Sequence, residues 1–483
     1  MIYRLAESLP LHDRRRRGIA PLVDVKLDEK ERIKMNKKPN ILFLMSDEHR
    51  ADTAGFAGNP VIRTPNLDRL AEAGVVFTNA YTPSPICIPA RQSIMSGQLP
   101  ETTGCKSYGQ DLAPGHMTFA RRFAQYGYAT VACGKLHHIG TDQMQGWMQR
   151  IGNEMQVDLP FLEGRDEIEC GKAVKPVGAM KWDQPKEVKR AGIGMAPHTV
   201  MDAYTVLGAT NFIDEYFLNP YYDRESPDRP LLLKVSLLQP HYPYIADEYK
   251  FRYYLNRVKP FEDQEVFDHP FLSRLQVRPG VDASEREIWR AVAAYYAMIE
   301  TVDDHFGTVM QALETAGQNL DDWIIIYTSD HGEMLGEHGV WEKQKFFEGS
   351  VRVPLIIRWP KGFDGGRILS ENVNLCDLFA TMCELSGIPV PPVLDSRSMV
   401  PLLTGSPLKW DNRTISQFGP HYIMIKQDHL KYQYYGPDMP EVLFDLSRNP
   451  EETMNFCGDP DYMRQMESFR KQRREFLQEG AVS

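Results

Sequence analysis

Short apolar runs alternate with stretches of helical spacing along most of the chain, and this alternation predicts an α/β fold. The clearest strand candidates are residues 40–45 (NILFLM), 129–133 (ATVAC), 231–238 (LLLKVSLL), 323–328 (WIIIYT) and 354–359 (PLIIRW). Runs that are apolar at nearly every position are typical of strands buried on both faces of a parallel sheet. Between them, residues 64–73 and 290–316 show helical patterns. We therefore expect a large, mixed but mostly parallel sheet flanked by helices.

The pattern changes after residue 385, where Pro389, Pro391 and Pro392 mark a linker. Short runs separated by turn residues follow, at 422–426 (YIMIK), 430–435 (LKYQYY) and 441–446 (EVLFDL). They predict a small antiparallel sheet, and a charged helix over residues 461–478 closes it. We expect a main domain over residues 39–385 and a C-terminal α+β subdomain over residues 386–483.

Residues 1–38 are predicted to be an N-terminal extension. Four consecutive arginines at 14–17 could suggest a twin-arginine export signal, but residues 18–38 contain no apolar core, so we reject that interpretation. We expect a solvated basic arm that packs on a second subunit of a homo-oligomer, either a dimer or a tetramer.

Composition narrows the function classes. The chain has 55 Lys and Arg against 65 Asp and Glu, a net charge of −10. This argues against a nucleic-acid partner, which needs a basic surface, but not against a small anionic substrate. The 7 cysteines show no paired spacing, so neither a disulfide framework nor a zinc site is predicted and a reducing cytoplasm is expected. No apolar run approaches the roughly 20 residues of a membrane span, so no membrane partner is expected.

Polar side chains follow four of the predicted strands, at 46–49 (SDEH), 134–138 (GKLHH), 239–241 (QPH) and 329–332 (SDHG). The carboxyl ends of parallel strands meet at one edge of a sheet, so we expect these clusters to share one cleft. Asp47, Asp330 and His331 offer oxygen ligands and one imidazole, which suit a divalent cation. Each aspartate alone could be a helix cap or a turn residue. Glu48 either binds the metal or orients a neighbour.

A second group lies in residues 84–91 (SPICIPAR). Pro89 is placed to start a helix, so Cys87 is predicted at or just before a helix N-terminus, where free N–H groups and the helix dipole favour an anion. Arg91, one turn further, adds a fixed cation. Taken alone, Cys87 could equally be an ordinary buried cysteine.

These residues carry a family resemblance. CIPAR (87–91) fits the sulfatase signature C-x-P-[SA]-R, and further similar blocks occur in family order at 46–81, 134–140 (GKLHHIG), 239–244 (QPHYPY), 328–360 and 443–456. The chain resembles the formylglycine-dependent sulfatases of the alkaline phosphatase superfamily over roughly residues 39 to 457. Ordered matches of this kind are highly specific.

The resemblance implies an alkaline phosphatase-like fold, with the main domain as the catalytic domain. It implies that a formylglycine-generating enzyme oxidises Cys87 to formylglycine. The hydrate of this aldehyde would bind the metal through one oxygen and attack sulfur. Asp47, Asp330 and His331, together with the modified Cys87, would hold one divalent cation.

The resemblance also assigns the residues that act on the substrate. Arg91 would hold the hydrate and offset its charge. Lys135, His241 and Lys343 would bind the sulfuryl oxygens and protonate the leaving alcohol. His137 would remove the proton of the second hydroxyl, so that the aldehyde returns and sulfate leaves.

The sequence departs from the commonest family pattern at Asp47-Glu48 and at Asp330-His331. Many sulfatases have Asp-Asp and Asp-Asn there, whereas the Asp-His pair is shared with choline sulfatases and phosphonate monoester hydrolases. An imidazole ligand suits manganese better than calcium, while family habit favours calcium, so both stay open. We expect a sulfatase of arylsulfatase type. The alternatives are a phosphonate monoester or phosphodiester hydrolase and a choline sulfatase, and a pseudoenzyme would require gaps that the site does not show.

Overall fold

The fold is described from a computed structural model that places residues 38–152, 184–218, 229–261, 269–273, 276–406 and 409–478. Pro39–Ser483 form one compact unit by their internal contacts. The predicted N-terminal extension, with its proposed role in oligomer contacts, lies outside the described residues apart from Lys38. The predicted boundary at residue 386 stays a prediction. No helix among the described residues is both long and apolar enough to cross a membrane.

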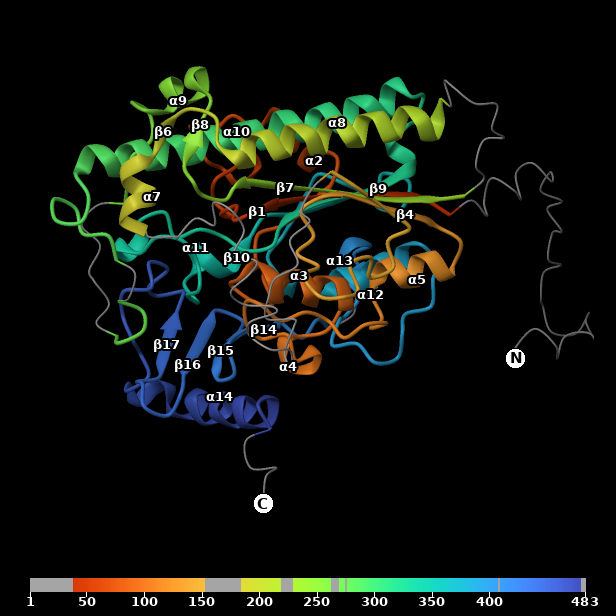
Figure 1. The fold of residues 1–483 in the computed structure, drawn as a ribbon. Helices are drawn as coiled ribbons and strands as arrows, with labels where there is room; N and C mark the ends of the chain where they lie inside the picture. The colour runs from red at the N-terminus through yellow and green to blue at the C-terminus, as the bar shows by residue number, and fades with distance from the viewer. Residues whose placement is uncertain are drawn as a thin grey trace, which may run out of the picture. The chain divides into compact units, whose positions relative to one another are not determined.

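An eight-stranded sheet runs through the centre of the molecule in the order β12-β2-β11-β9-β1-β7-β4-β5 (Figure 1). Its strands are β1 (Asn40–Asp47), β2 (Val75–Phe77), β4 (Ala129–Gly134), β5 (Gln149–Ile151), β7 (Leu231–Pro240), β9 (Trp323–Ser329), β11 (Leu355–Arg358) and β12 (Arg367–Leu369). Only β11 runs against its neighbours, antiparallel to both β9 and β2. The predicted mixed, mostly parallel sheet is therefore confirmed.

Both faces of the sheet are covered by helices, which explains why its strands are apolar at nearly every position. On β1, Ile41 and Phe43 point into a core shared with α3 (Cys87–Ser96), α5 (Phe119–Gln125) and α12 (Asp377–Leu385). The alternate residues Leu42 and Leu44 point into the core beneath α2 (Pro65–Glu72), α8 (Pro197–Phe217) and α10 (Glu285–Thr315). In Figure 1 the long helices α8 and α10 lie above the sheet, and α3, α5 and α12 lie below it.

The two predicted helices are observed, as α2 and α10. Helix α10 begins five residues before the predicted start, because Ser284 and Glu287 form a capping box in which each side chain accepts the other's backbone N–H. Helix α8 was not among the predicted elements. Its apolar side chains are spread around the helix, and Tyr204 and Leu207 are exposed, so it lacks a clear apolar stripe.

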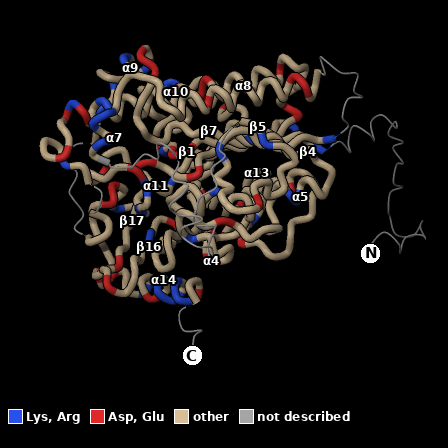
Figure 2. Tube along the Cα trace, in the orientation of Figure 1, with Lys and Arg blue, Asp and Glu red and all other residues tan. Residues whose placement is uncertain are grey.

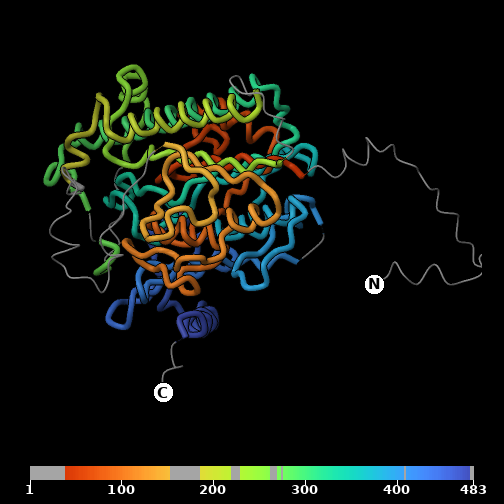
Figure 3. The backbone as a smooth tube through the Cα atoms, turned by 45° about the vertical axis from the view of Figure 1, so that its right-hand side comes forward, coloured from red at the N-terminus to blue at the C-terminus, as the bar shows by residue number. Residues whose placement is uncertain are grey.

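The predicted C-terminal antiparallel sheet is also observed. It consists of β14 (Arg413–Phe418), β15 (Tyr422–Gln427), β16 (Leu430–Tyr435) and β17 (Val442–Asp445), hydrogen-bonded in that order. Helix α14 (Met463–Phe476) packs under this sheet through Met466 and Phe469, and Figure 3 shows the helix end-on. Its other side carries charges of both signs, as do the outer helices α7 (Gln184–Arg190) and α9 (Glu248–Tyr254) (Figure 2).

A buried ion cluster joins this small sheet to the main sheet's loops. Lys431 on β16 is fully buried, and its ammonium contacts Glu348, at 2.9 Å, and Glu452. The Glu452 carboxylate also accepts the backbone N–H of Glu348 at 2.7 Å. Glu348 begins the short helix α11 (Glu348–Val351), five residues after Lys343. The C-terminal sheet therefore fixes one end of the segment that carries Lys343.

Replacing Lys431 by methionine should destabilise the protein strongly. The substitution keeps most of the side-chain volume but takes the cation from the buried Glu452 carboxylate, while Glu348 keeps its contact with Arg352 at 3.1 Å. Removing one partner of a buried ion pair costs about 3–5 kcal/mol. Urea unfolding should show a lower midpoint for K431M. The matched control is Lys471→Met on the exposed side of α14, which should stay within about 0.5 kcal/mol of the wild type. Equal midpoints for both variants would contradict the role given to Lys431.

Candidate active site

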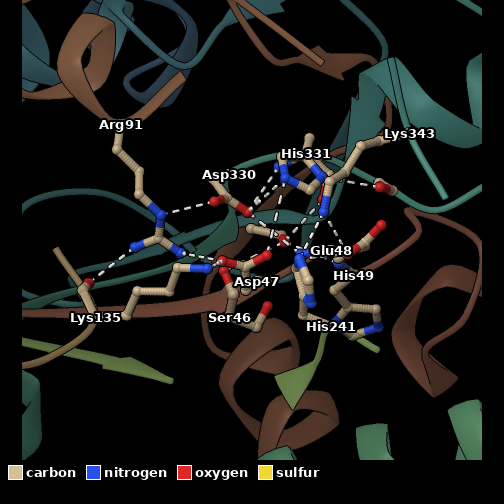
Figure 4. Close-up of polar contacts among 12 residues, drawn as sticks. Ser46, Asp47, Glu48, His49, Arg91, Lys135, His241, Asp330, His331 and Lys343 are labelled. Atoms are coloured by element: carbon tan, nitrogen blue, oxygen red, sulfur yellow. Dashed lines mark hydrogen bonds and ion pairs between the residues drawn. The ribbon is translucent and has the colours of Figure 1, made fainter. Parts of the chain in front are cut away.

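The polar residues that follow the central strands meet at one edge of the sheet (Figure 4). Asp47 ends β1, Lys135 and His241 directly follow β4 and β7, and Asp330 directly follows β9. These four strands are parallel neighbours, and the register pairs Asp47 with Pro240 on β7. The convergence expected from the sequence is therefore present in the fold.

Four side chains could hold a metal ion together. One donor atom each from Asp47, Cys87, Asp330 and His331 lies within 4.8 Å of the others, and all four residues are buried. The His331 Nδ1 lies 3.0 Å from the Gly332 carbonyl, which can only accept, so Nδ1 carries a proton and Nε2 of the neutral imidazole presents a lone pair. This Nε2 is 3.8 Å from Asp47 Oδ1 and from Asp330 Oδ1.

Two of these possible metal-ligand atoms, Asp47 Oδ1 and His331 Nε2, have no hydrogen-bond partner in the described part of the chain. Buried acceptors are almost always satisfied, so two unsatisfied acceptors facing one point indicate a site for a cation. Carboxylate oxygens with one imidazole nitrogen match the ligands of a divalent metal, and the Cys87 sulfur completes the group. The residues present therefore fit the metal that the resemblance implies.

Arg91 holds the outer oxygens of the same carboxylates. It is fully buried, its Nε donates to Asp330 Oδ2 at 2.7 Å, and its Nη2 donates to Asp47 Oδ2 at 3.0 Å. Its Nη1 donates to the Lys135 carbonyl and to the Ser236 hydroxyl, both at 2.9 Å. Arg91 thus orients both carboxylates so that their Oδ1 atoms face His331. Its predicted contact with a hydrate on residue 87 stays a prediction.

Cys87 is the first residue of α3, and only 3% of it is exposed. Burial alone would raise the pKa of its thiol, but the charges of Lys343 and Lys135 and a hydrogen bond with His137 hold this pKa well below its ordinary value. The position therefore stabilises an anion on residue 87. The helix start at Cys87 agrees with the expectation drawn from Pro89.

Two lysines, Lys343 and Lys135, and the imidazole of His241 also lie near Cys87. The Lys343 Nζ lies 2.6 Å from His241 Nε2 and 2.8 Å from Glu48 Oε2, and the Lys135 Nζ lies 2.5 Å from Asp47 Oδ2. The His241 Nδ1 donates to the Tyr242 carbonyl at 2.7 Å, so Nε2 accepts from Lys343. Burial, followed by the charge of Lys343, lowers the pKa of His241 to about 3, so its imidazole is neutral.

Two residues near this group were not predicted from the sequence. His198, in the first turn of α8, lies with Nδ1 3.3 Å from the His241 carbonyl. Tyr108 places its ring edge-on to His137, with centroids 6.2 Å apart, and is 53% exposed. Each is a single residue without a motif around it, so no sequence signal distinguished them.

Comparison with known proteins gives a consistent result. Residues 39–388 match the Sulfatase family, and residues 336–479 match the C-terminal region of N-sulphoglucosamine sulphohydrolase. The chain is 32% identical to a choline-sulfatase of Rhizobium meliloti (strain 1021) over 442 residues, which cover 88% of this chain and 83% of the relative. It is 29% identical to an arylsulfatase of Clostridium perfringens over 460 residues, which cover 90% and 93% of the two chains.

The fold has close counterparts among solved structures. The phosphonate monoester hydrolase of Agrobacterium radiobacter superposes with a TM-score of 0.72 at 23% sequence identity, covering 91% of this chain and 95% of that one. At this identity the likeness concerns the fold, which is the alkaline phosphatase-like arrangement expected from the sequence.

The metal site predicts the effect of Asp330→Ala. The variant loses one ligand atom and one partner of Arg91, so metal affinity should fall by more than the roughly 10–100-fold that loss of an outer hydrogen-bond partner costs. Elemental analysis after dialysis should find one divalent ion per chain in the wild type and little in D330A. Asp322→Ala is the control, because this carboxylate precedes the same strand but its side chain is 49% exposed. Full metal retention in D330A would rule the site out.

Proposed function

The chain belongs to the sulfatase family, and from that premise we propose that it hydrolyses sulfate monoesters of arylsulfatase type through a formylglycine made from Cys87, beside a divalent cation. The observation that carries the proposal is the position of Cys87. It lies at a helix N-terminus between a carboxylate and imidazole group that fits a metal and a group of lysines and histidines that fits an anion. An unmodified thiol has no need of either group.

The metal would act as a Lewis acid. A cation held by Asp47, Asp330, His331 and the modified residue 87 would polarise a sulfuryl oxygen and favour an ionised hydroxyl on residue 87. Calcium and manganese both remain candidates, because the imidazole favours manganese and the family favours calcium. Arg91 keeps the carboxylates in place from behind, so the site does not have to reorganise as charge develops.

The substrate side is formed by Lys135, His241 and Lys343. Two ammonium groups and a neutral imidazole around one point favour a bound anion and exclude a neutral ester. Lys343 donates to His241 Nε2 in this arrangement, so Lys343 has the proton to give to the leaving oxygen and His241 holds the ammonium in place. His137, which interacts with the Cys87 sulfur, is placed to take the proton that restores the aldehyde.

The similarity to a choline-sulfatase favours a second candidate, hydrolysis of choline sulfate. A quaternary ammonium leaving group needs aromatic faces or carboxylates near the site mouth. Tyr108, exposed beside His137, is one such aromatic side chain. Values of kcat/KM for choline sulfate and for 4-nitrophenyl sulfate, measured side by side, decide between the two candidates.

Conversion of Cys87 is the first test of the proposal. Protein made together with the formylglycine-generating enzyme should yield a peptide in which residue 87 has the mass of the aldehyde or its hydrate. Cys87→Ala should be inactive because no nucleophile can form, whereas Cys457→Ala, a partly buried position that packs against the core of the C-terminal sheet, should keep its activity. Fully active protein with only unmodified cysteine at position 87 would refute the proposal.

Substrate charge gives the second test. Sulfate monoesters, phosphonate monoesters and phosphate diesters carry one negative charge, whereas phosphate monoesters carry nearly two. With 4-nitrophenol as the common leaving group, kcat/KM should be highest for the sulfate and lowest for the phosphate monoester. Turnover of the phosphonate monoester or phosphate diester at least about tenfold better than the sulfate, a preference of about 1.4 kcal/mol, would make the chain a hydrolase of those esters instead.

A further inference from the structure

Glu48 occupies the position next to the metal ligand Asp47, yet its backbone turns its side chain elsewhere. Its φ angle is +67°, in the left-handed region that residues with a Cβ atom rarely adopt. Such a conformation costs about 1–3 kcal/mol and persists only where the surroundings hold it. Here the Glu48 carbonyl accepts from the Tyr295 hydroxyl at 2.6 Å, and its N–H donates to Asp330 Oδ1 at 3.3 Å.

The carboxylate of Glu48 is directed at the lysine of the substrate side. It is fully buried, and its Oε2 lies 2.8 Å from Lys343 Nζ and 3.3 Å from His241 Nε2. Glu48 is not part of the group formed by Asp47, Cys87, Asp330 and His331; its own ligand-type neighbours are Asp47 and His241. The Lys343 ammonium contacts both Glu48 and His241 (Figure 4). The positive charge beside Glu48 and His241 is therefore that of the lysine, and no metal ion is needed there.

Neighbouring residues also restrict the position of Lys343. Lys343 Nζ lies 4.8 Å from the centroid of the Tyr242 ring. Glu342 and Gln344 on either side of Lys343 both have left-handed backbones, with φ of +66° and +70°. The Glu333 carboxylate accepts the N–H of Glu342 at 2.7 Å and so fixes this strained turn from behind.

We propose that Glu48 is a positioning residue, which acts through Lys343 and is not a metal ligand. Its carboxylate holds the ammonium beside His241, so that the lysine stays directed at the leaving oxygen of the substrate. Without that contact, the long lysine side chain is free to move toward Asp47 and the bound anion, and donation to the leaving group is lost. The inference rests on the proposed function, because that function gives Lys343 its role at the leaving oxygen. The contacts of Glu48 are observed and do not depend on the proposed function.

Glu48→Gln separates the two roles, because the amide keeps the shape of the side chain and removes its charge. For a positioning residue, E48Q retains one metal ion per chain. Its kcat/KM falls about a hundredfold or more for phenyl sulfate, which needs help to its leaving oxygen, and less than about tenfold for 4-nitrophenyl sulfate, which needs little. A steeper dependence on leaving-group pKa with unchanged metal content is a result that a purely structural defect does not produce.

Coupling to Lys343 completes the test. In K343A the leaving-group dependence is already steep, so adding E48Q should change kcat/KM by less than about twofold, whereas independent effects would multiply. Glu48→Asp, which keeps the charge on a shorter arm, should recover part of the activity on phenyl sulfate, and it replaces E48Q if that variant does not fold. Loss of metal in E48Q, an unchanged leaving-group dependence, or multiplicative effects in the double variant would each overturn the proposal.

The same series distinguishes this proposal from the proposed function. If the wild type turns over aryl phosphonates in preference to aryl sulfates, the arylsulfatase assignment fails. The leaving-group series is then run on the aryl phosphonates, and the expectations for E48Q, E48D and K343A stay the same.

Discussion

One buried guanidinium organises the site. Arg91 bridges Asp47 and Asp330, two carboxylates that come from separate strands and lie 283 positions apart in the sequence. Two anions placed together away from water repel each other strongly, so each would take up a proton unless a fixed cation offset the charge. Despite complete burial, the charges of Lys135 and Arg91 hold the pKa of Asp47 well below its ordinary value. Asp47 is therefore held in its ionised form without a metal.

The consequences of this bridge extend through the fold. Arg91 belongs to the same short helix as Cys87, so the contact that orders the carboxylates also sets where Cys87 lies. A second buried ion cluster, around Lys431, does the same for the segment that carries Lys343. The C-terminal sheet is thus part of the site's support although it supplies no residue to the group around Cys87.

Much of this arrangement was predictable from the sequence, because the strongest signals are local. Apolar runs followed by polar clusters gave the central strands and the residues at their ends, and Pro89 with Arg91 placed Cys87 at a helix start. Contacts across long sequence separations gave no such signal. The spacing of residues 354–359 shows a strand but not its direction, and β11 proved to run antiparallel. His198, Tyr108 and the clamp made by Arg91 depend on which elements become neighbours in space, and a periodicity does not encode that.

The near-complete burial of Cys87 also bears on the order of events in the life of the chain. A modifying enzyme must take a short extended stretch of its target into its own cleft, whereas here the cysteine begins a fully buried helix. Under the modification proposed for Cys87, maturation and folding would therefore compete for the same segment. A molecule that folds first would keep an unmodified Cys87, so the yield of modified protein would reflect the ratio of two rates as much as the equilibrium stability of the fold.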